Sequence, residues 1–195
     1  MTLVEVLVTT SILVVVMIAV GTFQYNVLNY NRSTQIRLTN IQDATSILKV
    51  IARELRASAI SANGSYAINA AATSTLTFFA DIDSDGLPEQ LHYFLTGQTM
   101  YRGVIKPIGS PAVYNPAQET LKIIATGVVN SSTTPLFEYY GSTYTGTSTA
   151  MIYPLVLTSI RLIKTNITID TDPNKSPVIR TFSTQAALRN LKDNL

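Results

Sequence analysis

The chain has 195 residues, of which 46% are hydrophobic and 13% are charged, so it carries few charges for a freely soluble protein and must bury apolar surface. Lys and Arg number 14 against 12 Asp and Glu, and the net charge of +2 is too small to indicate a nucleic acid or an acidic substrate as partner. The absence of Cys excludes thiol catalysis, disulfides and Cys-based zinc sites.

The first predicted element is an apolar segment at the N-terminus. Residues 6–23 carry no charge, and a stretch of about 18 such residues is long enough to predict a membrane-spanning helix. Glu5 stands at its head, and a carboxylate at the centre of a membrane helix costs roughly 2.5–3.5 kcal/mol, so Glu5 requires a partner. Thr2 and Glu5 also fit a capping box, in which the hydroxyl and the carboxylate satisfy free amides at a helix start.

The first basic residue, Arg32, follows the apolar segment. Signal peptides and ordinary membrane anchors carry Lys or Arg before their apolar region instead. This order predicts that a short basic leader preceded residue 1 and was removed, which would make Met1 a mature N-terminus.

The helical pattern is expected to continue beyond the membrane segment, because residues 24–60 contain neither Pro nor Gly. Apolar residues spaced by three and four form one stripe: Ile41, Ala44, Leu48, Ile51 and Leu55. A helix from about residue 2 to residue 58 would be roughly 85 Å long, so its distal half must pack on a head domain. The charged residues off the stripe are expected to be solvated or to contact other subunits: Arg37, Asp43, Lys49, Arg53, Glu54 and Arg56.

Strand patterns follow from about residue 66. The predicted strands are residues 75–80, a hairpin of residues 90–95 and 99–104 around Gly97, and residues 121–125, 155–166 and 178–188. Two stretches are expected to be surface loops: residues 106–119, which contain three Pro, and residues 131–150, which are rich in Ser, Thr, Gly and Tyr. One helix followed by a series of strands predicts an α+β fold.

An acidic segment lies between the first two predicted strands. Asp81, Asp83, Asp85 and Gly86 occupy the first, third, fifth and sixth places of an EF-hand-type calcium loop, but the twelfth place holds His92 instead of Glu. Two interpretations stay open. One is a structural Ca²⁺ site with these ligands: Asp81, Asp83, Asp85, the Leu87 carbonyl and Glu89. The other is a turn in which Asp side chains cap the backbone and Gly86 adopts positive φ.

Catalysis is the function with the least support from the sequence. His92 is the sole histidine, and its alternation with Leu91 and Tyr93 indicates a position on a strand face. The neighbourhood of the acidic segment contains no recognisable nucleophile with an orienting base. We therefore expect a protein that is not an enzyme.

The N-terminal sequence MTLVEVLV followed by an apolar helix resembles the mature N-terminus of type IV pilins and type II secretion pseudopilins. Weaker similarity to the minor-pilin and J-type pseudopilin group extends to residues 79–86, 88–93, 101–102, 181–184 and 188–191. The resemblance implies leader cleavage before Met1, methylation of its amine, and a Glu5 that compensates the terminal amine of a neighbouring subunit. Met1 departs from the commoner Phe of that family.

The sequence thus predicts a long N-terminal helix packed on an antiparallel sheet, with a membrane or filament-core segment at residues 1–24, an amphipathic half at residues 25–60 and a head domain at residues 61–195. The resemblance implies a structural subunit of a type IV pilus or similar filament. Its implied partners are copies of itself, other pilins, an inner-membrane assembly platform, a leader peptidase and membrane lipid. Two alternatives are a minor pseudopilin of a type II secretion system and a single-pass anchored surface domain that adheres or binds ligand.

Overall fold

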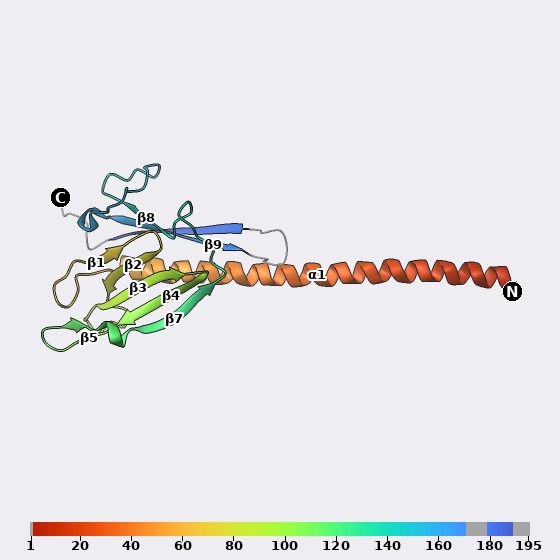
Figure 1. Cartoon of the computed structure of the whole chain (residues 1–195), viewed down its shortest axis with the longest axis horizontal. Helices are drawn as coiled ribbons and strands as arrows, with labels where there is room; N and C mark the ends of the chain where they lie inside the picture. The colour runs from red at the N-terminus through yellow and green to blue at the C-terminus, as the bar shows by residue number, and fades with distance from the viewer. Residues whose placement is uncertain (1, 171–178, 189–195) are drawn as a thin grey trace. The chain divides into compact units, whose positions relative to one another are not determined.

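The computed structural model describes residues 2–170 and 179–188, which form one long helix, two larger antiparallel sheets and a short two-stranded sheet (Figure 1). This is the predicted α+β fold. The chain divides into two compact units, residues 1–40 and residues 41–195. The second unit contains the last turns of the helix and all the strands.

Helix α1 comprises Leu3–Arg56, in agreement with the predicted continuous helix. It ends two residues before the predicted boundary because the chain there joins the sheet. Ser58 forms an antiparallel bridge with Ala80, and the amide of Ala59 donates a hydrogen bond of 2.9 Å to the carbonyl of Phe79. Strand pairing therefore takes the backbone out of the helix before the Gly and Asn residues further on can do so.

The larger sheet has five strands in the order β1-β2-β3-β4-β7 (Figure 1). Their bounds are β1 Ile68–Ala71, β2 Thr75–Ala80, β3 Glu89–Thr96, β4 Thr99–Ile105 and β7 Thr120–Thr126. The predicted strand at residues 75–80 and the predicted hairpin are confirmed, and Gly97 turns the hairpin with a φ of 59° that favours glycine.

The predicted loop at residues 106–119 contains structure of its own. Strands β5 Pro107–Ile108 and β6 Val113–Tyr114 pair as a short hairpin, and a 3₁₀ turn follows at Pro116–Gln118. Asn115 caps that turn through its side chain, which accepts a hydrogen bond from the amide of Ala117. The three Pro residues indicated a loop but did not reveal its pairing.

The second sheet has the order β10-β9-β8, with β8 Phe137–Tyr140, β9 Leu162–Asp170 and β10 Ile179–Ala187. Two predictions are wrong here. Strand β8 lies inside the predicted loop at residues 131–150. The burial of Phe137 and Tyr139 offsets the entropy lost when this segment pairs with β9. The predicted strand at residues 155–166 begins only at Leu162, after a 3₁₀ turn at Leu157–Ser159. Two predicted features lie partly outside the described residues: Val178, the start of the last predicted strand, and residues 189–191, part of a segment similar to minor pilins.

The core joins the helix stripe to both sheets. Ala44, Leu48, Ile51 and Leu55 are at most 5% exposed and belong to one cluster with apolar residues from both sheets, including Phe78 and Ile163. Burying a side chain of this size contributes about 1.5–3 kcal/mol relative to exposure. The predicted packing of the stripe on the protein's own sheet is confirmed.

Candidate functional site

The N-terminal part of α1 is a candidate functional segment because its apolar side chains are exposed. Residues Leu3–Asn31 are long and apolar enough to cross a membrane, judged by length and composition, and none of the most apolar 18 residues among them is buried. Residues 6–23 alone would span about 27 Å as a helix, close to the hydrocarbon thickness of about 30 Å. This is the composition of a membrane or signal segment.

Glu5 lies in the first turn of this helix and caps its N-terminus. Its Oε2 accepts a hydrogen bond of 3.3 Å from the backbone amide of Thr2, which is one half of the predicted capping box. The other partner expected for Glu5, an amine from a neighbouring subunit, stays a prediction. Met1, the expected site of leader cleavage and methylation, lies outside the described residues.

The hydroxyl groups in the apolar segment are satisfied within the helix. Thr9, Thr10, Ser11 and Thr22 donate hydrogen bonds of 2.8–3.1 Å to carbonyls three or four residues earlier. A hydroxyl paired in this way can enter a water-free environment without leaving its donor unsatisfied. These polar residues are therefore compatible with lipid or with a core of packed helices.

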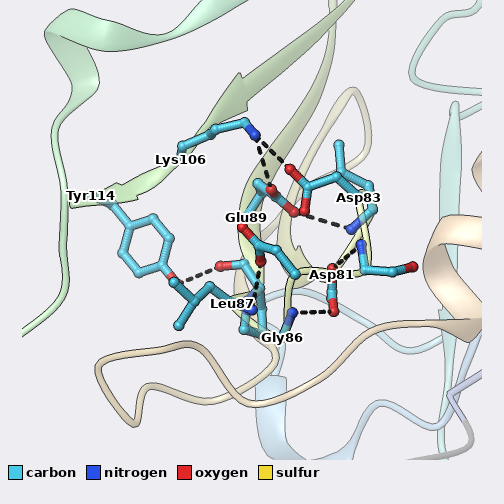
Figure 2. A network of polar contacts seen from close by, with 11 residues as sticks. Asp81, Asp83, Gly86, Leu87, Glu89, Lys106 and Tyr114 are labelled. Carbon is cyan, nitrogen blue, oxygen red and sulfur yellow. Dashed lines mark hydrogen bonds and ion pairs between the residues drawn. The ribbon is translucent and has the colours of Figure 1, made fainter.

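The acidic segment is the second candidate site, and strand pairing positions it. Ala80 at the end of β2 pairs with Glu89 at the start of β3, so residues 81–88 form the loop that closes this hairpin (Figure 2). Asp81 accepts hydrogen bonds from the amides of Ser84 (2.6 Å) and Gly86 (3.0 Å), and Gly86 has a φ of 86°. The loop has the geometry of the predicted Asp-capped turn.

Three of the predicted calcium ligands converge within this loop. Asp81, Asp83 and Glu89 each place a carboxylate oxygen within 4.8 Å of the other two (Figure 2). Asp85 is not part of this group; its carboxylate instead accepts a hydrogen bond of 2.8 Å from the amide of Leu87. The binding of calcium is still a prediction, but the convergent set differs from the EF-hand pattern that suggested it.

Lys106, which follows β4, faces two of the three carboxylates, Asp83 and Glu89 (Figure 2). Its Nζ lies 2.5 Å from Oδ2 of Asp83 and 3.9 Å from Oε1 of Glu89. The hydrogen bond from Lys106 lowers the pKa of Asp83, and the same contact raises the pKa of Lys106. Burial raises the pKa of Glu89, because its side chain is 1% exposed and desolvation disfavours the charged form.

The prediction that Glu54 is solvated or contacts another subunit is wrong, because Glu54 is buried against partners within the chain. Glu54 is 4% exposed, and its carboxylate accepts hydrogen bonds from the phenol of Tyr93 (2.5 Å) and from Nη2 and Nε of Arg102 (2.7 and 3.2 Å). Burial, followed by the Glu54 carboxylate, raises the pKa of Tyr93 and keeps its phenol neutral. A sequence signal was present: strand alternation places Arg102 on the same face as the core residue Met100, where a guanidinium needs a buried counterion.

A groove of about 430 Å³ opens beside this ion pair, between helix residues 46–54 and strand β7. Ile47, Val50 and Ile123 contribute apolar walls, and the polar lining includes Glu54 and Arg102 together with Ser46, Arg53 and Lys122. Because Glu54 and Arg102 bind each other, the groove presents mainly apolar surface. This ion pair holds the helix against the sheet.

His92 lies on strand β3, as predicted from its alternation. Its two ring nitrogens contact Oγ1 of Thr75 (3.1 Å) and Oε1 of Glu119 (3.0 Å), and its ring stacks on Phe94. Glu119 reaches the ring only because Gly103 lacks a side chain; a Cβ there would lie 1.8 Å from Oε1 of Glu119. The contacts give a hydrogen-bonded chain across the sheet face.

The fold and the N-terminal segment together define a pilin-like architecture, in which a long apolar N-terminal helix is followed by antiparallel sheets. Beyond the architecture, comparison with known proteins adds no closer assignment. No family model matches the sequence, and no curated protein matches it either.

Proposed function

We propose that the chain is a structural subunit of a type IV pilus or pilus-like filament, held in the membrane through α1 before assembly. The observation that carries the proposal is the exposed apolar face of Leu3–Asn31 with Glu5 in its first turn, attached to a β-rich domain. The side chains of residues 3–31 of α1 belong to no core cluster among the described residues. This segment therefore requires lipid or other helices to cover it.

Transfer from lipid into a bundle of neighbouring helices provides the physical route to assembly. Lipid tails are as apolar as the side chains they cover, so association depends on close packing and on polar contacts between helices. Glu5 supplies such a polar contact. A carboxylate in lipid costs at most roughly 2.5–3.5 kcal/mol, the value at the helix centre, and less toward the helix end where Glu5 lies; an amine of a neighbouring subunit would offset that cost.

The partners that follow from this proposal are copies of the same chain, other pilins, an inner-membrane assembly platform and membrane lipid. The location would change from the inner membrane of a bacterial cell to the cell surface. The roles of minor pilin and of secretion pseudopilin use the same assembly principle. The head domain would then form the outer surface of the filament.

The second candidate is a single-pass anchored surface domain that acts as a monomer. The same span supports it, because length and composition identify a membrane helix without specifying assembly. The exposed apolar groove beside β7 offers this candidate a surface for ligand or adhesion. The two candidates differ in whether Glu5 needs a second subunit.

Electron microscopy of filaments sheared from cells that produce the full chain, with labelling by an antibody to the head domain, tests the proposal. Wild-type chain is expected in helical filaments, and Glu5→Ala is expected in the membrane fraction without filaments. Asp43→Ala is the matched control, because it removes an exposed acid from the same helix outside the apolar segment. It should assemble normally.

One result would contradict the assembly role of Glu5, and a second would contradict the filament proposal itself. If Glu5→Ala builds filaments in normal number and length, Glu5 has no role in assembly. If the wild-type chain stays in the membrane as a monomer while the head domain is accessible at the surface, the anchored domain is the better description.

A further inference from the structure

We propose that Asp81, Asp83 and Glu89 form a calcium site, and that the ammonium of Lys106 occupies the place of the cation until Ca²⁺ displaces it. The ligand set differs from the EF-hand pattern, because Asp85 takes no part. Calcium binds oxygen ligands at about 2.3–2.6 Å, so two oxygens on one ion lie at most about 5 Å apart. The three carboxylates meet this condition, since their oxygens lie within 4.8 Å of one another (Figure 2).

Glu89 gives an independent indication of a missing partner. Its side chain is 1% exposed, one oxygen accepts a hydrogen bond of 3.0 Å from the amide of Ile82, and the other, Oε1, is buried without a hydrogen bond. Its ion-pair partner, Nζ of Lys106, lies 3.9 Å from Oε1, beyond hydrogen-bond distance. A buried carboxylate oxygen without a donor is costly, and a bound cation would satisfy it directly.

Lys106 neutralises only part of the negative charge of the carboxylates. Asp81, Asp83, Asp85 and Glu89 bring four carboxylates into nine residues, and Lys106 brings one ammonium to them. Its side chain is 65% exposed and flexible, so it can move into solvent at little cost when a divalent ion arrives. The ion would supply twice the charge of the ammonium at the point where the three carboxylates meet.

The chemistry of the ligands favours calcium over other divalent ions. All three side chains are carboxylates, which suits hard cations, whereas zinc and copper prefer nitrogen or sulfur. Magnesium demands near-ideal octahedral geometry and gives up its water reluctantly, but calcium accepts irregular sets of six to eight oxygens. Two of the ligands lie in a turn and one at a strand end, an irregular arrangement that calcium tolerates better.

Isothermal titration calorimetry of the full chain in detergent micelles, first freed of divalent ions, tests the proposal with CaCl₂ and then with MgCl₂. We expect one site for calcium, with a Kd on the order of 10⁻⁴–10⁻³ M as in extracellular calcium modules. Glu89→Gln should weaken binding at least about tenfold, because it removes a buried charge from the ion. Lys106→Met should strengthen binding several-fold, because it removes the competing ammonium.

Two controls distinguish this ligand set from a diffuse effect of charge. Asp85→Asn removes a charge from the same loop, retains an oxygen for the amide of Leu87, and should change the Kd less than about threefold, as expected for a charge outside the first coordination sphere. Lys164→Met frees Glu138 from its own lysine and should create no second site, because Glu138 stands outside any group of convergent carboxylates in the described residues.

The results that overturn the proposal are specific. Absence of both heat and a rise in melting temperature with calcium up to about 10 mM would remove the site, since linkage requires stabilisation by any ligand of the folded state. Equal loss of affinity in Asp85→Asn and Glu89→Gln would replace this ligand set with the EF-hand pattern. Magnesium binding as tight as calcium would overturn the choice of ion. If Glu89→Gln does not fold, Asp83→Asn takes its place with the same expected loss.

Discussion

The buried pair of Glu54 and Arg102 leads to a prediction about what holds the helix to the sheet. Arg102→Met leaves the Glu54 carboxylate, 4% exposed, with Tyr93 as the remaining partner of this network. Removing one partner of a buried ion pair costs about 3–5 kcal/mol. Because the Arg102 side chain is 18% exposed and water can enter from that side, we expect the lower end, about 3 kcal/mol.

Chemical and thermal unfolding of the full chain in detergent, followed by circular dichroism, measures this loss. For a domain of this size, each kcal/mol corresponds to about 2–4 °C, so Arg102→Met should lower the melting temperature by about 6–12 °C. Lys122→Met is the matched control, because Lys122 is exposed and lies opposite Arg102 in the register of β4 and β7. This substitution should change the free energy of unfolding by less than about 0.5 kcal/mol.

The double variant Glu54→Met/Arg102→Met provides the decisive comparison. Replacing both charges with apolar side chains removes the unpaired carboxylate, so the double variant should be more stable than Arg102→Met alone, with a coupling of about 2 kcal/mol. Additive losses, or a loss below about 0.5 kcal/mol for Arg102→Met, would refute the reasoning that Glu54 depends on this partner.

Two further predictions concern other contacts of the sheets. Gly103→Ala should displace Glu119 from His92, because the new Cβ would lie 1.8 Å from Oε1, and the ring signals of the single histidine in an NMR spectrum should shift as they do in Glu119→Ala; unchanged signals would show that the contact does not form. Burial acts to raise the pKa of Glu138, but the hydrogen bonds from Lys164 and Tyr140 together with the charge of Lys164 outweigh it and lower that pKa below the ordinary value of 4.5. Glu138 therefore stabilises the fold by about 1 kcal/mol at neutral pH, and this contribution should fall as the pH drops below about 4.5. The difference in stability between wild type and Glu138→Gln, measured by urea unfolding, should shrink in that range; a difference independent of pH would contradict it.

The helix and its packing could be predicted because periodicity is a local signal. Spacing by three and four predicts a stripe from Ile41 to Leu55, and the structure buries it from Ala44 onward while Ile41 is half-buried. Strand β8 could not be recognised by composition, since its short aromatic run lies among Ser and Thr residues and gains its stability from β9, more than 20 residues later. Long-range pairing of this kind is not encoded in any short window of sequence.

For the candidate sites as well, local sequence patterns predicted some contacts, and the contacts that depend on distant strands could not be predicted. The alternation of acids predicted that Asp81, Asp83 and Glu89 would lie near one another, but it also included Asp85, which the turn directs to the amide of Leu87. The part played by Lys106 depends on the register of β3 and β4, so the acidic segment alone could not predict it. The sequence predicts a solvated or intersubunit position for Glu54, because helical periodicity does not show which side chains the opposing strand presents.

The strand order has a consequence for the path of folding. Neighbours in the larger sheet are also neighbours along the chain, apart from the short β5–β6 hairpin between β4 and β7, so most of this sheet can form through closures of short loops. Contacts that join the helix and the second sheet to it are distant in sequence: Tyr93 and Glu54 are 39 residues apart, and Tyr139 and Ala72 are 67 apart. We therefore expect the hairpins of the larger sheet to form early and the last turns of α1 to dock late, so that, if α1 enters a membrane as proposed, the head domain could begin to fold during that insertion.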